Sequence, residues 1–390
     1  MVMEAPRSGA SPAPVSIMCL GHPLLDMMAT VEESFMREHH VEPGSVTLAS
    51  PEQLGLFSKL LDEFEGQVDY VPGGAAMNTA RVLAWMLPGA RISYVGALGK
   101  DRFAEILTNA LTSAGVEHLF EECNDKPTGT CAGLVLNKDR TLLANLGAAV
   151  NLSLKHMQTE AVQSAMERAS VYYAEGFFLN TASSPDNLLS VAQHAHLHGK
   201  VFCFNLNAPY ISMAFQSRIQ LLMPHVDILF GSDEDLLTYA SVRWPRDFDL
   251  STLGSAMRPN SRRQAALVRC LARISMLPTV TTGRPRLVVG TCGSHDTYVA
   301  CGDRVRSYPV PPMAQEEMVD VNGAGDAFVA GFLAQYVVNR DESTSVVVGH
   351  ASAQNCIRHN GAIVSGVPPP LARRISAPAA PPHVMSTPAM

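Results

Sequence analysis

A glycine-rich turn late in the chain carries the residues best suited to chemistry. Residues 319–333 read VDVNGAGDAFVAGFL, in which Gly323, Ala324 and Gly325 precede Asp326 and an apolar helical pattern. Glycines let a turn point its backbone amides at one ligand, and the following helix adds the positive end of its dipole. Such a turn can hold an anion. Asp326 beside it is placed to accept a proton from an attacking hydroxyl group.

Each candidate residue also has an ordinary structural explanation. Asp326 could serve only as a favourable acid in the first turn of a helix. Gly74 precedes a second predicted helix, in which Asn78 either pairs with sugar hydroxyls through its donor and acceptor or faces solvent. Asp26, at the end of GHPLLD (21–26), is either a ligand for two vicinal hydroxyls or an exposed turn residue. Taken one at a time, the residues leave these alternatives open.

Composition and charge limit the classes of protein to which the chain can belong. Its 390 residues, 47% hydrophobic and 17% charged, can bury a large globular core. The formal net charge of −7 disfavours a broad nucleic-acid-binding face, whereas local backbone donors can still hold small anions. No run reaches the ~18 apolar residues of a membrane span, and the start of the chain has no signal-peptide core. We expect no nucleic-acid or membrane partner, and a cytoplasmic location with the nucleus as a second possibility.

Cysteine and histidine spacing does not indicate a metal site. None of the eight cysteines stands in a Cys-x-x-Cys pair, and they are scattered through apolar segments. This distribution predicts reduced, mostly buried thiols rather than a disulfide framework or a zinc site. His194, His196 and His198 lie on a predicted helix, but only the first and third share a face. We interpret them as surface residues.

Strand-like and helix-like segments alternate along most of the chain. Short apolar runs that end in small or polar residues predict strands at 15–21, 91–99, 170–178, 201–207, 226–232 and 286–293. Helical spacing predicts helices at 77–87, 103–115, 183–198, 211–223 and 264–276. This order predicts an α/β fold with a mostly parallel sheet and helices on both faces. In such folds ligands gather at the carboxyl ends of the strands.

One segment interrupts this alternation. Residues 128–147 contain two extended runs around Asn137 and Arg140, which predicts a hairpin. A hairpin does not easily join a parallel sheet, so we expect a small β lid built from about 28–49 and 118–150. Residues 246–285 are basic, polar and proline-spotted, and are expected to form a surface insertion.

The two ends of the chain differ in composition from its middle. Residues 1–15 are rich in proline, serine and alanine, and residues 368–390 are dense in proline without periodicity. We expect disordered tails on both sides of a single domain over 16–367.

Several short motifs occur together with the glycine turn. They are GHPLLD, PGGAAMN, KPTGTC, RTLLANLGAA, YYAEGFF, FNLNAPYI and VDILFGSDED. In order and spacing they resemble the adenosine kinase branch of the ribokinase-like sugar and nucleoside kinases, over about residues 16–366. The resemblance implies a Rossmann-type α/β domain with a small lid. It also implies transfer of the γ-phosphoryl group of ATP to the 5′-hydroxyl of adenosine, with magnesium, by a monomeric enzyme of purine salvage.

The resemblance also implies a role for individual positions. Asp326 matches the general base, and Gly323, Ala324 and Gly325 match the anion hole. Asp26, Gly74 and Asn78 match ribose contacts, and His22, Phe178 and Gln315 match positions of the adenosine pocket. Arg140 matches an arginine of the lid. The positions that match ATP-binding residues are Thr291, Gly293, Asn322 and Ser232, and Asp235 matches a residue that would reach magnesium through water. These roles suit phosphoryl transfer, which depends on positioning and charge neutralisation. A closing lid would exclude water.

Four positions depart from the usual pattern of that family. His22 replaces an asparagine, and the bulkier imidazole predicts weaker or altered nucleoside binding. Ser232 and Asp235 replace the ends of an Asn-x-x-Glu motif that orders the water around magnesium and phosphate, which predicts changed magnesium affinity or turnover. Val321 replaces a threonine and removes one hydroxyl group.

Three functions therefore stay in view, and we prefer the first. The first is phosphorylation of adenosine. The second is a kinase of the same family that acts on another nucleoside or on a sugar, which His22 and Met77 would favour. The third is a catalytically weakened regulator that binds a nucleoside, which Val321 and the altered 232–235 motif would favour. A dinucleotide-dependent dehydrogenase fits poorly, because its glycine motif should follow the first strand, where the sequence reads GHPLLD.

Overall fold

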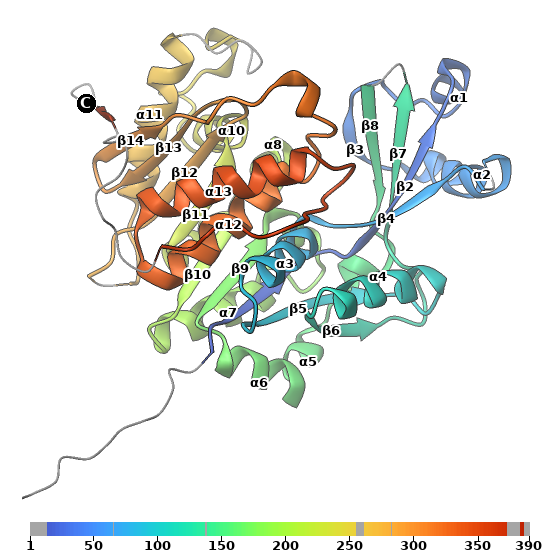
Figure 1. Ribbon diagram of the computed structural model, residues 1–390, viewed down its shortest axis with the longest axis horizontal. Helices are drawn as coiled ribbons and strands as arrows, with labels where there is room; N and C mark the ends of the chain where they lie inside the picture. Colours follow the sequence, from blue (N-terminus) through green and yellow to red (C-terminus); the bar gives the residue numbers. More distant parts are fainter. Residues whose placement is uncertain are drawn as a thin grey trace, which may run out of the picture.

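Two β-sheets of different size organise the chain (Figure 1). The computed structural model describes residues 14–64, 66–136, 139–254, 261–281, 283–372 and 383–385. Within these residues a 10-stranded sheet forms the main body, and a 5-stranded sheet lies beside it. The structure thus confirms the predicted α/β class with a mostly parallel sheet and a smaller β unit.

The large sheet is parallel over most of its width. Its strands lie in the order β15 (His383–Met385), β14 (Arg304–Tyr308), β13 (His295–Cys301), β12 (Leu287–Cys292), β11 (Ile228–Ser232), β10 (Val201–Asn205), β9 (Val171–Glu175), β1 (Ser16–Leu20), β5 (Arg91–Leu98) and β6 (Glu117–Glu122). Neighbours are parallel from β12 to β6, and antiparallel from β12 to β15. Every residue of β1, β9 and β10 is buried, because both faces are covered, and these strands therefore read as unbroken apolar runs.

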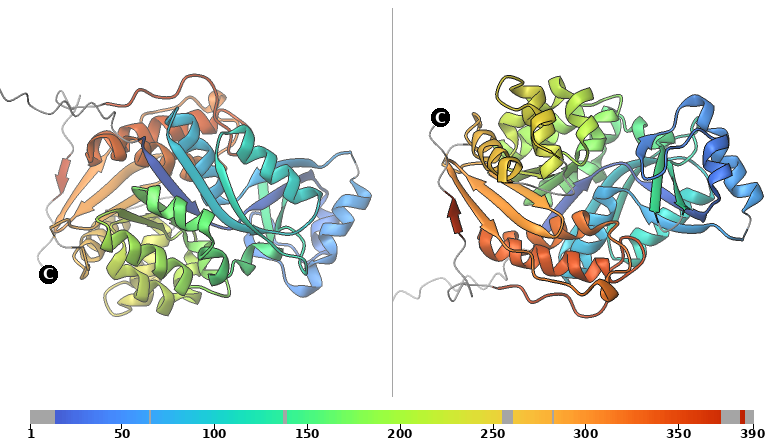
Figure 2. Two further views of the ribbon diagram at one scale, coloured as in Figure 1. Left: turned by 90° about the horizontal axis from the view of Figure 1, so that it is seen from below. Right: turned by 90° about the horizontal axis from the view of Figure 1, so that it is seen from above.

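Helices cover both faces of this sheet (Figure 2). Along β10, Phe202 and Phe204 enter one core cluster and Val201 and Cys203 the other, because successive side chains of a strand alternate. The first cluster includes residues of α5 (Leu154–Met157), α6 (Glu160–Arg168), α7 (Asp186–Leu197), α8 (Pro209–Ala214), α9 (Gln216–Leu222), α10 (Asp233–Arg243) and α11 (Ser261–Ser275). The second includes residues of α3 (Ala75–Met86), α4 (Arg102–Ser113), α12 (Ala324–Asn339) and α13 (Glu342–Ile357).

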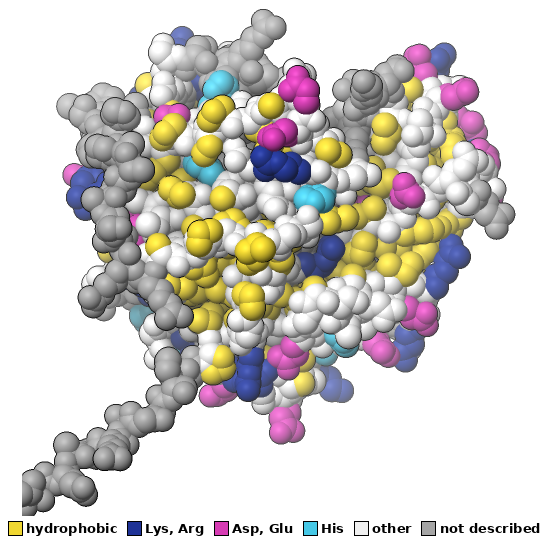
Figure 3. All heavy atoms as spheres, in the orientation of Figure 1, with side chains coloured by type: hydrophobic (Ala, Val, Ile, Leu, Met, Phe, Trp, Pro, Cys, Tyr) yellow, Lys and Arg dark blue, Asp and Glu magenta, His cyan; other side chains and the backbone are white. Residues whose placement is uncertain are grey.

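The small sheet has its own core on one face only. Its strands lie in the order β3 (Val46–Leu48), β8 (Asp139–Asn145), β7 (Thr130–Leu136), β2 (Leu24–Thr30) and β4 (Asp69–Gly73). One face packs on α1 (Glu33–Glu38) and α2 (Gly55–Glu63) through a separate cluster. Along β2, Leu25, Met27 and Ala29 are buried, whereas Asp26 is partly exposed. Hydrophobic side chains also gather on the surface near β4, the edge strand of this sheet (Figure 3).

The predicted hairpin forms the middle of the small sheet. β7 and β8 pair antiparallel, with Leu136 opposite Asp139. Asn137, at the predicted turn, lies outside the described residues. The boundaries of the small unit differ from the expected ones: β4 belongs to it, whereas β6 is the edge strand of the large sheet. Which sheet β4 and β6 join depends on pairing with strands that are distant in the sequence, and no local sequence pattern predicts that pairing.

Residues 246–285 are not a simple surface insertion. Their described part contains η5 (Leu250–Thr252) and α11, whose Leu267, Cys270 and Leu271 are buried in the first core cluster. Arg262 and Arg269 on the same helix are exposed. Part of the basic character of the segment thus belongs to the solvent face of an amphipathic helix, whereas Arg263 on this helix is buried and pairs with Asp233.

The expected disordered tails fall mostly on residues that the structure does not describe. Residues 1–13, 373–382 and 386–390 lie outside the described part of the chain. The backbone of His383–Met385 pairs with β14 as an added strand, which differs from the expected unordered tail.

All eight cysteines are free thiols, and six of them are buried. Burial raises the pKa of the Cys131 and Cys203 thiols well above the usual range, which disfavours the reactive thiolate. Among the described helices, none combines the length and the apolar composition that crossing a bilayer requires.

Candidate active site

Two cavities meet at the carboxyl ends of the parallel strands. The inter-sheet cavity, about 290 Å³, lies between the two sheets, and the small sheet contributes Asp26, Thr47, Leu48, Cys131, Leu142 and Ala144 to its lining. The strand-end cavity, about 220 Å³, lies at the ends of β10, β11 and β12. Asn207, Gly325 and Asp326 line both cavities. A third recess, about 320 Å³ at the β6 edge, contains none of the predicted site residues.

The glycine-rich turn forms the start of α12. Gly323 precedes the helix with a φ of +75°, and a Cβ at this position would lie 2.4 Å from the Cβ of Ala362, so the turn requires glycine. A Cβ on Gly325 would meet nothing within 4 Å, so this side of the turn is open. The first-turn amides of a helix have no carbonyl partners within it. Here they lie beside both cavities, where they can stabilise an anion.

Asp326 follows that turn and is held by a residue from another helix. Asn78, from α3, donates a hydrogen bond from Nδ2 to Oδ2 of Asp326 at 3.0 Å. Burial raises the pKa of Asp326 to about 7, against the opposing effect of the Asn78 hydrogen bond. A carboxylate with this pKa can accept a proton at neutral pH. The side-chain oxygen of Asn78, Oδ1, is buried and has no partner in the described part of the chain.

The floor of the inter-sheet cavity includes a neutral histidine. His22 is 1% exposed and lines the cavity together with Asp26 and Gly74. Its Nε2 lies 2.9 Å from the Thr181 hydroxyl, whereas Nδ1 has no partner among the described residues. Burial lowers the pKa of His22 to about 3, so the ring is neutral near pH 7. His22 can therefore offer a hydrogen bond to a ligand without adding charge.

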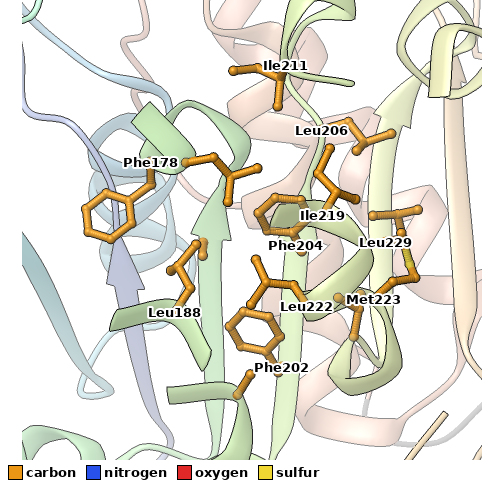
Figure 4. Packing of buried hydrophobic residues seen from close by; sticks show 14 of the residues in the cluster. Phe178, Leu188, Phe202, Phe204, Leu206, Ile211, Ile219, Leu222, Met223 and Leu229 are labelled. Atoms are coloured by element: carbon orange, nitrogen blue, oxygen red, sulfur yellow. The ribbon is translucent and has the colours of Figure 1, made fainter. Parts of the chain in front are cut away.

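An aromatic pair forms one wall of this cavity. The rings of Phe177 and Tyr210 stack with centroids 6.1 Å apart, and both residues line the cavity. The sequence instead points to Phe178, which is fully buried in the first core cluster (Figure 4) and lies with its ring centroid 5.5 Å from that of His22. Both phenylalanines belong to η3 (Gly176–Asn180), a tight helical turn that directs neighbouring side chains differently.

The strand-end cavity is lined by polar groups at the ends of three strands. Thr291 is the next-to-last residue of β12, and Ser232 ends β11. The Ser232 amide and hydroxyl both donate to Oδ2 of Asp235, at 2.8 and 2.7 Å, and Asp235 N donates back to Ser232 Oγ at 3.1 Å. This pair caps α10, and both residues line the cavity. Burial raises the pKa of Asp235 to about 6.

Besides Phe178, four further predicted positions lie elsewhere or are only partly described. Asn322 lines the inter-sheet cavity rather than the strand-end cavity. Gln315 is exposed in η6 (Gln315–Glu317), and Gly293 lies in the turn after β12; neither lines a cavity. The backbone of Arg140 is part of β8, and its side chain lies outside the described atoms.

Sequence reasoning did not single out two polar residues that line the cavities. Glu175 ends the apolar strand β9, and Asn207 follows β10 with a φ of +62°. The side chain of Asn207 accepts a hydrogen bond from Gly176 N at 2.7 Å. Glu175 could have been found in the sequence as a single acidic residue at the end of an otherwise apolar strand, because ligands bind at the carboxyl ends of strands in this fold class.

Comparison with known families gives a match over most of the chain. The model of the pfkB family carbohydrate kinase matches residues 58–250 and 263–369. Adenosine kinase 1 of Arabidopsis thaliana is 34% identical over 345 residues, which is 88% of this chain and 94% of the relative. Adenosine kinase of Dictyostelium discoideum is 33% identical over 357 residues, which is 91% of this chain and 98% of the relative.

Solved structures give the same likeness in three dimensions. Adenosine kinase of Anopheles gambiae in complex with P1,P4-di(adenosine-5) tetraphosphate superposes with a TM-score of 0.79 at 31% identity, covering 90% of this chain and 97% of the other. Adenosine kinase of Schistosoma mansoni in complex with 2-fluoroadenosine superposes with a TM-score of 0.78 at 27% identity, with the same coverage.

Proposed function

This chain belongs to the pfkB family of carbohydrate kinases, and we propose that it is an adenosine kinase that forms AMP and ADP from adenosine and ATP. The observation that carries this proposal is the position of Asp326. It lies where the two cavities meet and is hydrogen-bonded to Asn78. A base at such a junction can accept a proton from an alcohol in one cavity while that alcohol attacks a phosphoryl donor in the other.

The inter-sheet cavity is suited to a nucleoside. Asp26 and Asn78 present a carboxylate and an unpartnered amide oxygen, which suit the hydroxyl groups of a ribose. The stacked Phe177 and Tyr210 offer an apolar wall for a planar base. The ribose 5′-hydroxyl would then lie toward Asp326.

The strand-end cavity and the glycine turn are suited to the phosphates of ATP. As the 5′-oxygen of adenosine attacks the γ-phosphorus, Asp326 accepts its proton, and the bond from the γ-phosphorus to the bridging oxygen of ADP breaks. The first-turn amides of α12 stabilise the charge on the moving phosphoryl group. Closure of the small sheet over the site would keep water away from the reaction.

Magnesium is the metal that this chemistry implies, and the donor set fits a metal carried by the triphosphate. The described residues contain no cluster of three His, Cys, Asp or Glu side chains that could hold a metal directly. Ser232 and Asp235 supply oxygen atoms beside the strand-end cavity, where they could hold metal-bound water. Bound magnesium would neutralise charge on the β- and γ-phosphates.

The direct test is a phosphorylation assay with purified full-length protein. ATP, magnesium and adenosine should give stoichiometric AMP and ADP. Absence of AMP, together with phosphorylation of another nucleoside or a sugar, would make the adenosine assignment wrong. His22 favours including that alternative, because its neutral ring lies in the acceptor cavity. Adenosine binding without turnover of any acceptor, with either magnesium or manganese, would indicate a regulator instead.

We also propose that the enzyme is a monomer. One face of the small sheet is already packed on α1 and α2, so that face is not available to a second copy. Light scattering at assay concentrations should give the mass of one chain, 41.9 kDa, and a mass twice this value would contradict the proposal.

A further inference from the structure

One buried acid at the site has no role in the chemistry described above. Glu175 is 1% exposed and lines the inter-sheet cavity. No lysine or arginine in the described part of the chain forms a salt bridge with it. Burial raises its pKa to about 8. Burying a carboxylate without a cation is costly, so its remaining contacts indicate what it does.

The two oxygens of Glu175 join two separate segments of the chain. Oε1 accepts a hydrogen bond from His22 N at 2.6 Å, and Oε2 accepts one from Ala76 N at 2.6 Å. His22 lies in the connection from β1 to β2, and Ala76 lies in the first turn of α3. One carboxylate therefore ties the entry to the small sheet to the start of a helix of the main body.

Gly21, which has no side chain, leaves room for this carboxyl group. A Cβ on Gly21 would lie 2.6 Å from Cδ of Glu175 and 2.6 Å from the Cβ of Ala76. Any other residue at position 21 would push the carboxyl group away from its two amide donors. The close approach of the three segments depends on this glycine.

Both tied segments lead to residues that face the acceptor cavity. Asp26 lies four residues after His22, and Asn78 lies two residues after Ala76 and holds Asp326. We propose that Glu175 is a positioning residue: it fixes the β1–β2 connection and the start of α3 so that the acceptor alcohol is aligned with Asp326. This inference rests on the proposed phosphoryl transfer to an alcohol in the inter-sheet cavity.

Glu175→Gln tests the proposal in the full-length enzyme. The amide keeps one acceptor oxygen but turns an NH2 group toward the second backbone N–H, which loses its partner. We expect the KM for adenosine to rise about tenfold, the amount that loss of one such hydrogen bond gives, and the KM for ATP to change less than about twofold.

Asp227→Asn is the matched control. Asp227 is 5% exposed, accepts a hydrogen bond from Phe202 N at 2.9 Å and pairs with Arg284, but lines neither cavity. This variant should lower the Tm and leave both KM values near those of the wild type. Equal changes in the two KM values of Glu175→Gln, or values that match the Asp227→Asn control, would overturn the positioning role.

Two further measurements keep the inference separate from the choice of substrate. Glu175→Asp retains a carboxyl group but is one methylene shorter and can reach only one amide, so it should show the same selective rise if the Gln variant does not fold. Amide hydrogen exchange needs no substrate, and in each variant the amide that loses its partner, that of His22 or that of Ala76, should exchange about tenfold faster; unchanged exchange at both amides would overturn the inference. If the wild type does not phosphorylate adenosine, the proposed function is wrong, and the KM comparison is made with the acceptor that it does use.

Discussion

Asp326 draws its properties from three separate parts of the molecule. The turn at Gly323 places it at the meeting point of the two cavities. Asn78, on a different helix, fixes its carboxylate through a 3.0 Å hydrogen bond. Burial then raises its pKa to about 7, close to the pH at which it would work. The position, the orientation and the proton affinity of the Asp326 carboxylate can therefore each be changed by a different substitution.

Asp326→Asn should remove the base while keeping the site intact. Asparagine is close in size and retains an oxygen that can accept the hydrogen bond of Asn78. We expect kcat to fall about 10²–10⁴-fold and the KM for adenosine to change little, because the lost interaction concerns the proton transfer. Steady-state kinetics over both substrates measures this. A tenfold or larger rise in KM with unchanged kcat would assign Asp326 to binding rather than to catalysis.

The pKa of Asp326 also predicts the pH dependence of the reaction. The base works only when deprotonated, so kcat should fall as the pH drops below about 7 and level off above it. Asp326→Asn should lose this inflection from whatever activity remains. Initial rates measured at saturating substrates across this range provide the check. An inflection near 3.8, the ordinary value for an aspartate, would show that the group is not desolvated as described.

At the scale of secondary-structure elements, the start of α12 offers a matched pair of glycines. Gly325→Ala has space for its methyl group but places it at the junction of the cavities, so we expect kcat to fall at least about tenfold with little loss of stability. In Gly323→Ala the new methyl group would clash with Ala362, and alanine would have to adopt a positive φ. This substitution should therefore lower the free energy of unfolding by about 1–3 kcal/mol. Kinetics and thermal unfolding of both variants separate these effects. Full activity of Gly325→Ala would contradict a phosphate site at this turn.

Arg286 holds several element ends together in the core behind the site. It is 1% exposed, and its five N–H groups donate to the carbonyls of Met223, Val226, Ile274, Leu277 and Pro278. Arg286→Met would leave these buried acceptors without partners, at a cost of about 3 kcal/mol or more. The more exposed Arg168, paired with Glu117, provides the control, because Arg168→Met should cost about 1 kcal/mol or less. Equal effects on denaturant unfolding would contradict this structural role of Arg286.

Predictability from the sequence differs between elements for a physical reason. The parallel strands β1, β9 and β10 were predictable because burial on both faces leaves continuous apolar runs. The glycine turn and Asn78 were found for a similar reason, since their signals are local. The contacts of Glu175 join residues 153 and 99 positions apart, and the place of Phe177 in the cavity wall depends on the geometry of a 3₁₀ turn. Neither leaves a local pattern.

At the scale of the whole molecule, the two cavities differ in which parts of the fold they join. The inter-sheet cavity is lined by both sheets, so a nucleoside in it contacts the small sheet and the main body together. The strand-end cavity is lined only by residues of the main body. The two substrates should therefore affect the small sheet differently, although both approach Asp326.

Hydrogen exchange of the small sheet provides the corresponding test. Adenosine alone should slow exchange in β7 and β8, because Cys131, Leu142 and Ala144 line its cavity and their strands become tied to the main body. A non-hydrolysable ATP analogue alone should leave these strands nearly unchanged while protecting the start of α12. At 100 times its Kd, either ligand should stabilise the fold by about 2.7 kcal/mol, so equal occupancy can be verified by thermal unfolding. Equal protection of β7 and β8 by the ATP analogue would contradict the separation of the two sites, because the nucleotide would then have to reach the small sheet as well.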